Sequence, residues 1–486
     1  MRSTELPSSL GFGPIANRPQ VINLPYLPIV LGAYAAAVAL APSLSWKALL
    51  AAPVLLAPPA LWTIFSERGW ISLFFVFALL LPPLPLGIGD TGPHPALAVV
   101  ALGLCAGVVR LREWRLRFEG PALPMLALLG ALLISIGPAA IYSGSSIAAA
   151  SLARVLLFAI SAYLFLYVAT GPARYCEDDI RRTTRLMFGV ACASALFACI
   201  DFYFQLPAPA GYGPQFVWLD SGVFRRAQGV FYEASTLGNF CAFFLVMICV
   251  ALFRRGGWLP CSRKALGAGA VVFSAALLFS YSRASLLNIF AALMAFAYLR
   301  GLRIRRVLLY AAGVAAAGAI VAYAAFPQFT ESYWLRLWFT GENLFNSPES
   351  TLSGRVESWR TLIDFLASHP WHWIFGVGYK TLPYSDYIGR TVVADNMYLS
   401  LLVETGLIGL LAFLVFNVAV LRSARLAAHS ANPRKAFFGR WIFCFWVGQM
   451  FQMFSGDLLT YWRVLPVYFW VLAIAVRNED SVSRSI

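Results

Sequence analysis

The sequence predicts an all-α polytopic membrane protein with about 14 transmembrane helices and a long periplasmic loop that carries an amphipathic helix. Hydrophobic residues make up 60% of the 486 and charged residues only 12%, and the mean hydropathy is +0.72. These values lie far outside the range of water-soluble domains. Runs of roughly 17 or more apolar residues also recur along the chain, and each could cross a hydrocarbon core of ~30 Å as a helix.

The predicted spans follow these apolar runs in order. They are 26–42, 46–65, 70–87, 95–109, 121–141, 148–169, 186–205, 235–253, 265–281, 284–299, 307–326, 396–421, 437–455 and 461–476. We divide the chain into N-terminal transmembrane helices (1–205, about seven), a catalytic core (206–421) with outer loops 206–234 and 327–395, and C-terminal helices (422–486).

Positive charge sets the predicted orientation, because short loops rich in Lys and Arg stay in the cytoplasm. When the spans are threaded alternately, five basic segments fall on one side: 110–117, 174–185, 254–264, 300–306 and 422–440. Both termini are then cytoplasmic, and residues 1–24 lack the pattern of a removable signal peptide. The net charge of +15 is therefore a topology signal, and we expect no nucleic-acid partner.

Cysteine and histidine patterns predict neither a metal site nor a disulfide. The eight cysteines fall in predicted spans or cytoplasmic loops, and the four histidines form no ligand box. We expect no cofactor.

Arginines in outer loops are the candidate functional residues, since a membrane protein places few cations there. Arg225 and Arg226 lie in the loop that leads to Glu233 and the eighth span, and Arg283 lies in a very tight turn between two spans. Arg154 lies within a span, where an arginine usually faces a partner or a polar cavity. Asp201 or Asp457 could be that partner.

The long segment 327–395 has internal order. Val356, Trp359, Leu362, Ile363 and Leu366 recur at helical spacing between positions 353 and 369. This pattern predicts an amphipathic helix that lies on the membrane and ends at a proline. The Gly-Val-Gly sequence at 376–378 permits a sharp turn or the close approach of a ligand. The segment also holds Arg355 and Arg360, which could equally belong to a solvated helix face.

Four elements together resemble the O-antigen ligase and Wzy-like polysaccharide polymerase superfamily. They are the long outer loop, an Arg-x-x-Gly-x-Phe-x-Glu element that starts at Arg226, a Ser-Arg-x-x-Leu turn around Arg283, and an Asn-x-Tyr-Leu-x-x-Leu-x-Glu-x-Gly-x-x-Gly box that starts at Asn396. These motifs cover about residues 220–410. Ligases of this family usually have histidine immediately before the box asparagine, where this chain has Asp395.

The resemblance implies a metal-independent, inverting glycosyltransferase of the bacterial inner membrane. It would act at the periplasmic face on an oligosaccharide linked to undecaprenyl diphosphate. Arg226, or its neighbour Arg225, and Arg283 would hold the diphosphate, and Asp395 or Glu233 would act as base, with Asp395 favoured. Arg154, Arg355, Arg360, Asn396 and Tyr398 are possible substrate contacts.

Several alternatives stay open at this point. The enzyme could polymerise lipid-linked repeat units of O-antigen or exopolysaccharide, or it could be a ligase that passes the glycan to lipid A core. Asp395 favours the polymerase. Flippase or chain-length regulator partners are possible. In a different class, a lipid-glycan flippase would also fit many spans. The purely structural interpretations are that Asp395 only caps the following helix and that Arg283 only extends its side chain to the membrane interface.

Overall fold

A computed structural model describes residues 57–84, 93–116, 118–173, 175–206, 213–219, 222–253, 258–301 and 355–477, with isolated positions in 33–43 and 309–338. The chain divides into two units, Met1–Trp62 and Thr63–Ile486, and the helices and sites below belong to the second. The predicted spans 26–42 and 307–326 and most of 46–65 lie outside the described residues.

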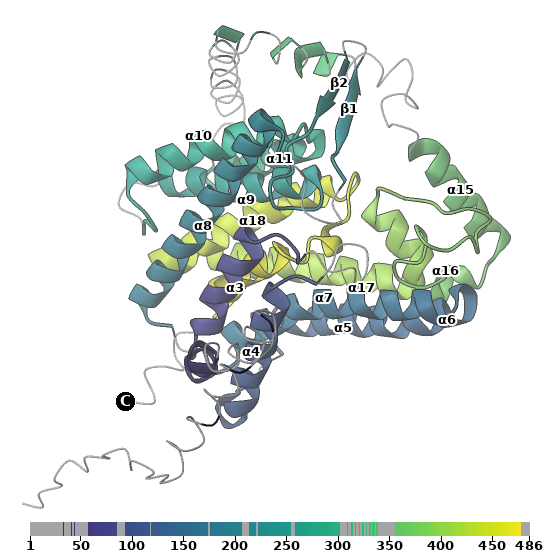
Figure 1. Ribbon diagram of the computed structural model, residues 1–486, viewed down its shortest axis with the longest axis horizontal. Coiled ribbons are helices and arrows are strands. Elements are labelled where there is room, and N and C mark those ends of the chain that lie inside the picture. Colours follow the sequence, from purple (N-terminus) through teal and green to yellow (C-terminus); the bar gives the residue numbers. More distant parts are fainter. Residues whose placement is uncertain are drawn as a thin grey trace, which may run out of the picture. The chain divides into compact units, whose positions relative to one another are not determined.

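Helices dominate the described part of the second unit (Figure 1). The longer ones are α3 (Gly69–Leu80), α4 (Ala96–Val109), α5 (Ala122–Ile134), α6 (Ile136–Ser143), α7 (Ser145–Ala169), α8 (Glu177–Phe204), α9 (Ala234–Leu252), α10 (Arg263–Phe279), α11 (Arg283–Leu299), α15 (Arg355–Ser368), α17 (Met397–Ala428), α18 (Pro433–Gln452) and α19 (Leu465–Val476). Short turns of helix are η1 (Leu111–Glu113), α16 (His372–Phe375) and η2 (Leu458–Thr460).

Five helical stretches in the described chain are long and apolar enough to cross a membrane. These are Ala122–Ser143, Ser145–Ala169, Glu177–Phe204, Ala234–Leu252 and Met397–Ala428. Shorter apolar helices are α3, α4, α11 and α19. The mostly helical membrane architecture is therefore confirmed, whereas the count of about 14 spans and the outer position of 327–395 stay predictions.

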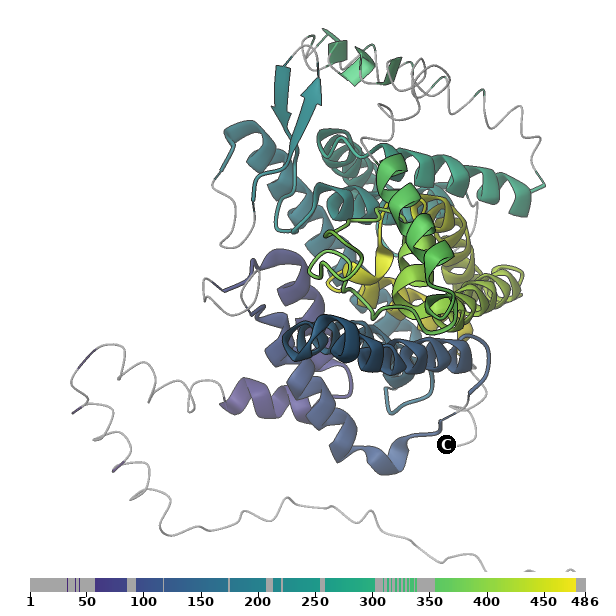
Figure 2. The ribbon, with the colours of Figure 1, turned by 90° about the vertical axis from the view of Figure 1, so that its right-hand side faces the viewer.

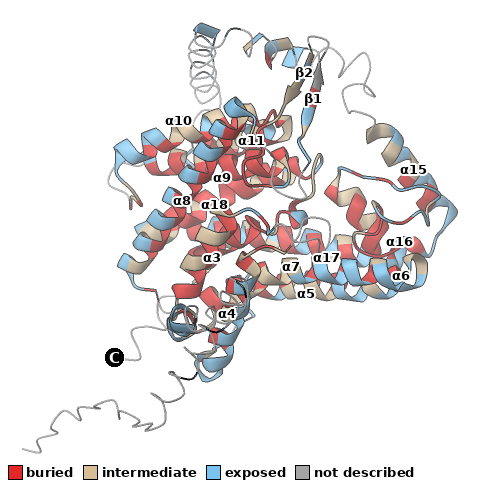
Figure 3. Ribbon diagram, viewed as in Figure 1, coloured by how far each residue is buried: buried red, intermediate tan, exposed pale blue. Residues whose placement is uncertain are grey.

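The core of this unit is built around α19. Each of its residues from Leu465 to Ala475 is buried. Figure 3 shows that the labelled helices α9 and α18 are largely buried too. A helix that is apolar on all sides is buried either in lipid or among other helices, and α19 is buried among helices. α19 packs against α7, α17 and α18, and α18 in turn packs against α9 and α11.

A strand hairpin interrupts the helical order in the loop 206–234. β1 (Phe216–Leu219) pairs antiparallel with β2 (Gly222–Arg225), with Phe216 opposite Arg225. Figure 2 shows the two strands side by side. Apolar periodicity did not predict this hairpin, because each strand has only four residues.

Arg463 ties three segments of the core together. Its guanidinium is buried and donates hydrogen bonds to the carbonyl oxygens of Ala78 (2.7 Å), Leu81 (2.7 Å) and Val230. Two of these carbonyls lie at the C-terminal end of α3, where carbonyl groups lack helical partners and the helix dipole favours a cation.

The long helix α17 is broken at Gly406, which has φ 68° and ψ −170°. Segment 376–378 fills the break. Val377 N–H donates to the Val403 carbonyl (3.0 Å) and Gly378 N–H donates to the Glu404 carbonyl (2.8 Å). The predicted turn at 376–378 is thus a close approach of two backbones, and a side chain at Gly376 or Gly406 would collide with the opposite backbone.

α15 confirms the amphipathic helix, and its apolar face packs against the protein. Leu362, Phe365 and Leu366 are buried in a cluster with Val377 and other residues of 377–403. Ile363 was predicted to lie on the buried stripe, yet it is 53% exposed. Phe365 takes its place because the partner surface meets a slightly different face of the helix.

We expect Gly406→Ala to destabilise the protein by at least about 2 kcal/mol, because its backbone conformation is accessible almost only to glycine and the methyl group would meet the Ile374 carbonyl. Thermal unfolding in detergent would measure the effect. Gly130→Ala in α5 is the control, since a Cβ there meets nothing within 4 Å. Equal melting temperatures for both variants would contradict this role of Gly406.

Candidate active site

The candidate site gathers at one end of the helices. Its residues come from the start of α9, the turn between α10 and α11, the starts of α15 and α17, and the segment between α18 and α19. These elements are far apart in sequence, and most of the site residues lie at or just before a helix N-terminus.

Arg226 follows β2 and is fixed by the α10–α11 turn. Its Nε donates to the Ser280 carbonyl (2.9 Å), and the next residue, Ala227, donates its N–H to the Phe279 carbonyl (2.9 Å). Burial lowers the pKa of Arg226, and the nearby cations Arg283 and Arg355 lower it further, whereas Glu233 and Tyr461 act in the opposite direction. The guanidinium groups of Arg226, Arg283 and Arg355 are therefore close enough to interact electrostatically.

Arg283 is the first residue of α11. The preceding Ser282 caps the helix, because its Oγ accepts a hydrogen bond from Ser285 N–H (3.3 Å). A cation at the positive end of a helix dipole is unfavourable unless an anion binds beside it. Arg283 and the helix N-terminus therefore both favour a negatively charged ligand at this point.

Arg355, the third cation of the site, is the first residue of α15 and binds the acidic residue before α17. Its Nε donates to Oδ2 of Asp395 (3.1 Å), and another guanidinium nitrogen donates to the Ser455 hydroxyl (3.3 Å). The side chains are partly open, at 24% exposure for Arg355 and 45% for Asp395. A pocket of about 300 Å³ lies beside this pair and is also lined by Arg390 and Ser358.

Asn396, not Asp395, caps α17. The Asn396 Oδ1 accepts hydrogen bonds from the N–H groups of Tyr398 (3.1 Å) and Leu399 (3.2 Å). The interpretation that Asp395 serves as the cap is therefore wrong. Asp395 has φ 45°, a left-handed conformation that Asp tolerates better than most residues, and its carboxylate is turned to Arg355.

Glu233 lies immediately before α9 and is half-buried. Its Oε2 accepts a hydrogen bond from the Ser235 hydroxyl (2.7 Å). Burial raises the pKa of Glu233, and the negative charge of Asp395 raises it too, against the opposing effects of Ser235 and Lys380. A raised pKa brings a carboxylate closer to the range in which it can accept a proton at neutral pH.

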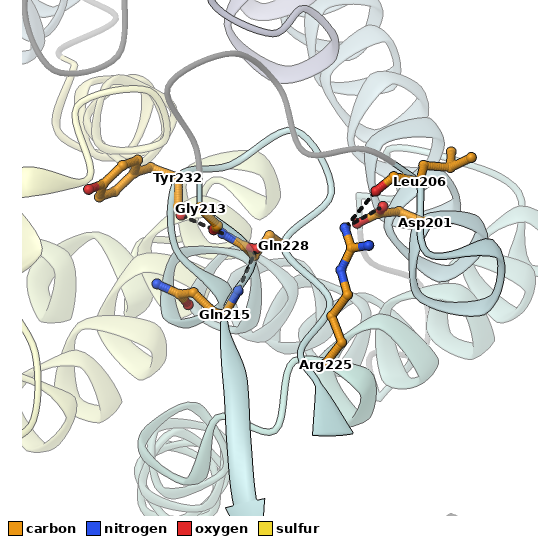
Figure 4. A network of polar contacts seen from close by, with 7 residues as sticks. All are labelled: Asp201, Leu206, Gly213, Gln215, Arg225, Gln228 and Tyr232. Carbon is orange, nitrogen blue, oxygen red and sulfur yellow. Dashed lines mark hydrogen bonds and ion pairs between the residues drawn. The ribbon is translucent and has the colours of Figure 1, made fainter. Parts of the chain in front are cut away.

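Arg225 has a different environment from Arg226. Figure 4 shows its guanidinium at Asp201 and Leu206, with distances of 3.2 Å to the carboxylate and 2.8 Å to the carbonyl. Arg225 is the last residue of β2 and pairs with Asp201, whereas Arg226, the next residue, bonds to the α10–α11 turn that carries Arg283. In the same figure Gln228 bonds to the Tyr232 carbonyl (2.7 Å), which fixes the loop before Glu233.

The remaining predicted contacts divide by position. Arg154 lies 4.2 Å from the centre of the Tyr384 ring, whereas both of its predicted partners bind other cations: Asp201 pairs with Arg225 and Asp457 with Lys380. Tyr398 donates its hydroxyl proton to the Met450 carbonyl (3.0 Å) and packs among aromatic rings. Arg360 is exposed on α15.

Lys380 and the acidic residues around it were not predicted as site residues. Lys380 forms an ion pair with Asp457, and Glu404 is buried nearby, where it accepts a hydrogen bond from Ser400 (3.1 Å). Burial lowers the pKa of Lys380, but Asp457 and Glu404 outweigh it, so the pKa is raised overall and the ammonium stays charged. No local pattern reveals this cluster, because only the docking of 376–378 against α17 brings its members together.

A buried network of amides and hydroxyls lies next to the first turn of α11. Gln452 donates to the Ser285 hydroxyl (3.1 Å) and accepts from both Asn239 (2.8 Å) and Asn288 (2.9 Å). Gln449 also accepts from Asn288 (3.2 Å). The network joins α9, α11 and α18 and holds the helix that carries Arg283.

Among the described residues, no group of three or more His, Cys, Asp or Glu side chains is arranged to hold a metal ion. The site instead combines three arginines, a lysine and several carboxylates. Such a site suits a ligand with two or more negative charges, because guanidinium groups bind phosphate oxygens through charge-assisted and often bidentate hydrogen bonds.

The fold is that of a multi-pass membrane protein, with several helices long and apolar enough to cross a membrane, and arginines and carboxylates gather at its candidate site. Residues 268–414 match the family model described as O-antigen ligase. In this part the chain is similar to the O-antigen ligase family, and this similarity supports a place in the O-antigen ligase and Wzy-like superfamily and a general ligase or polymerase type of function. The match includes Arg283, Arg355, Asp395 and Glu404. A search of curated proteins gave no match to the chain.

We expect Lys380→Met to lower stability by about 3 kcal/mol, because it leaves the carboxylates of Asp457 and Glu404 without their buried counter-charge. Thermal unfolding of the purified protein would measure this loss. The double variant Lys380→Met/Asp457→Asn should recover part of it, since one uncompensated charge is then removed. A melting temperature unchanged by Lys380→Met would show that the ion pair between Lys380 and Asp457 does not contribute to the stability of the fold.

Proposed function

We propose that this protein is a glycosyltransferase that moves a glycan from an undecaprenyl-diphosphate donor to a sugar hydroxyl at the periplasmic face of the inner membrane. The observation that carries the proposal is the convergence of Arg226, Arg283 and Arg355 beside Asp395 and Glu233. The O-antigen ligase match over 268–414 supports it independently.

In this proposal Arg226 and Arg283 hold the diphosphate at the N-terminus of α11. The leaving diphosphate gains negative charge as its bond to the anomeric carbon breaks, and fixed guanidiniums stabilise that charge. No metal ion is needed for this step in our scheme, since the arginines supply the positive charge.

Asp395 is proposed as the general base. It lines the pocket of about 300 Å³ together with Arg355, and this pocket gives an acceptor sugar room beside the carboxylate. The acceptor oxygen attacks the anomeric carbon, a new C–O bond forms, and the bond to the diphosphate oxygen breaks with its electron pair. The hydroxyl proton passes to Asp395, and the anomeric configuration inverts. Arg355 orients the carboxylate through the 3.1 Å hydrogen bond.

The favoured reaction is polymerisation of lipid-linked repeat units, with an acidic residue in place of the usual family histidine. The second candidate is ligation to lipid A core, which the description of the matched family favours. Purified protein incubated with undecaprenyl-diphosphate oligosaccharide alone separates them. A ladder of multiples indicates a polymerase. Product only after addition of lipid A core indicates a ligase, and no product with either acceptor would reject the glycosyltransferase in favour of a flippase.

We expect Arg283→Ala to lower turnover by about 10²–10³-fold, because it removes a charged donor to the leaving diphosphate. Arg263→Ala is the matched control, since Arg263 is also the first residue of a helix, α10, and follows a serine cap, Ser262. The control should keep wild-type turnover in the same assay. Equal activity of both variants would remove Arg283 from the mechanism.

The two carboxylates can be distinguished by isosteric amides. Asp395→Asn should reduce turnover by at least about 10²-fold at every pH, because general base catalysis contributes about that much, while the Asn396 cap keeps α17 intact. If Glu233 were the base, Glu233→Gln would cause this loss and Asp395→Asn would not. Its raised pKa would then place the acidic limb of the pH–rate profile above the usual glutamate range.

A further inference from the structure

A second pocket lies at the other end of the helices. It has a volume of about 650 Å³ and is formed by the segment after α4, the start of α5, the end of α7, and the facing ends of α17, α18 and α19. The candidate active site contains no residue of this pocket.

Chain direction places the pocket opposite the active site. α17 begins beside Asp395 and ends at Ala428 next to the pocket, whereas α18 and α19 connect the same two ends. After the break at Gly406, residues 407–428 of α17 rise about 33 Å at 1.5 Å per residue, which is close to the thickness of the hydrocarbon core of a bilayer. The pocket thus lies at the opposite membrane face, which the basic loops predict to be cytoplasmic.

The polar part of the lining is positively charged. It contains Arg112, Arg115, Lys435 and Arg477 against Glu113 and Glu119, so four cations and two carboxylates leave a net charge of +2. The loop that carries two of these arginines is fixed to the end of α7, since Arg115 N–H donates to the Thr170 carbonyl (3.0 Å).

The rest of the lining is apolar. It includes Phe165, Ala169, Ala427 and Val476, and Leu426 at its edge is 70% exposed. Leu116 and Phe118, on the loop that carries Arg115, are also more than half exposed. An exposed apolar rim is unfavourable in water but suits contact with acyl chains.

We propose that this pocket binds an acidic phospholipid of the bilayer. The cations would hold the phosphate group, and the apolar wall would hold the first part of the acyl chains. Basic pockets between helix ends at a membrane surface recognise anionic headgroups in this way. A soluble anion would use the cations but would leave the apolar wall exposed, so the lipid is the occupant that fits both parts.

The test uses the full-length protein, delipidated in detergent and titrated with phosphatidylglycerol or with phosphatidylcholine, with bound lipid counted by native mass spectrometry. Wild-type protein should bind phosphatidylglycerol much more tightly than phosphatidylcholine. Arg115→Gln/Lys435→Gln should weaken phosphatidylglycerol binding by roughly tenfold or more.

Arg263→Gln/Lys264→Gln is the matched control, because it removes the same charge from exposed residues at the start of α10, outside the pocket. It should bind phosphatidylglycerol as the wild type does. Glu119→Gln removes a negative charge from the pocket and should tighten phosphatidylglycerol binding. This variant tests the proposal through an effect in the opposite direction if the double variant fails to fold.

Three results would overturn the proposal. Equal binding of the two lipids by the wild type would remove the role of headgroup charge. Equal weakening by the pocket and control variants would indicate attraction by the whole surface. Displacement of phosphatidylglycerol by millimolar inorganic phosphate, from the wild type and the control variant alike, would indicate a soluble anion as the true occupant.

Discussion

The arrangement of the active site depends on the break in α17 at Gly406. A helix that breaks inside a membrane protein leaves backbone groups without partners, and each such group is costly in an apolar environment. Here segment 376–378 supplies the missing donors to the carbonyls of Val403 and Glu404. The same contact fixes the segment that follows, so it positions Lys380 beside Glu404 and brings α15 against the start of α17. Loss of this backbone contact would release most of the loop that carries the proposed base.

Much of the helical architecture was predictable from apolar periodicity. Most predicted spans within the described residues correspond to a helix, and the α15 segment was recognised from its 3.6-residue spacing. The buried face of α15 was less predictable, because the exact set of buried residues depends on the partner surface. Sequence spacing alone cannot distinguish Ile363, which is exposed, from Phe365, which is buried.

The residues of the candidate site likewise include some that the sequence predicted and some that it did not. Arg226 and Arg283 were singled out by their position in outer loops, and the structure brings both together with Arg355. Which of two adjacent arginines faces the site was not predictable, because it depends on the direction of side chains at the end of a strand. The choice of helix cap at 395–396 depends on a single φ angle. The partners of Lys380 come from two distant segments, so no local pattern could have revealed them.

The amide network next to the first turn of α11 has a consequence for how the site responds to its surroundings. Asparagine, glutamine and serine side chains do not titrate in the physiological range, so the layer formed by Asn239, Asn288, Gln449 and Gln452 keeps the same charge in acid and in base. It also supplies no counter-ion to the arginines above it. A change of pH around the site would therefore act on the carboxylates of the loops, while the charge of the layer under Arg283 would remain constant.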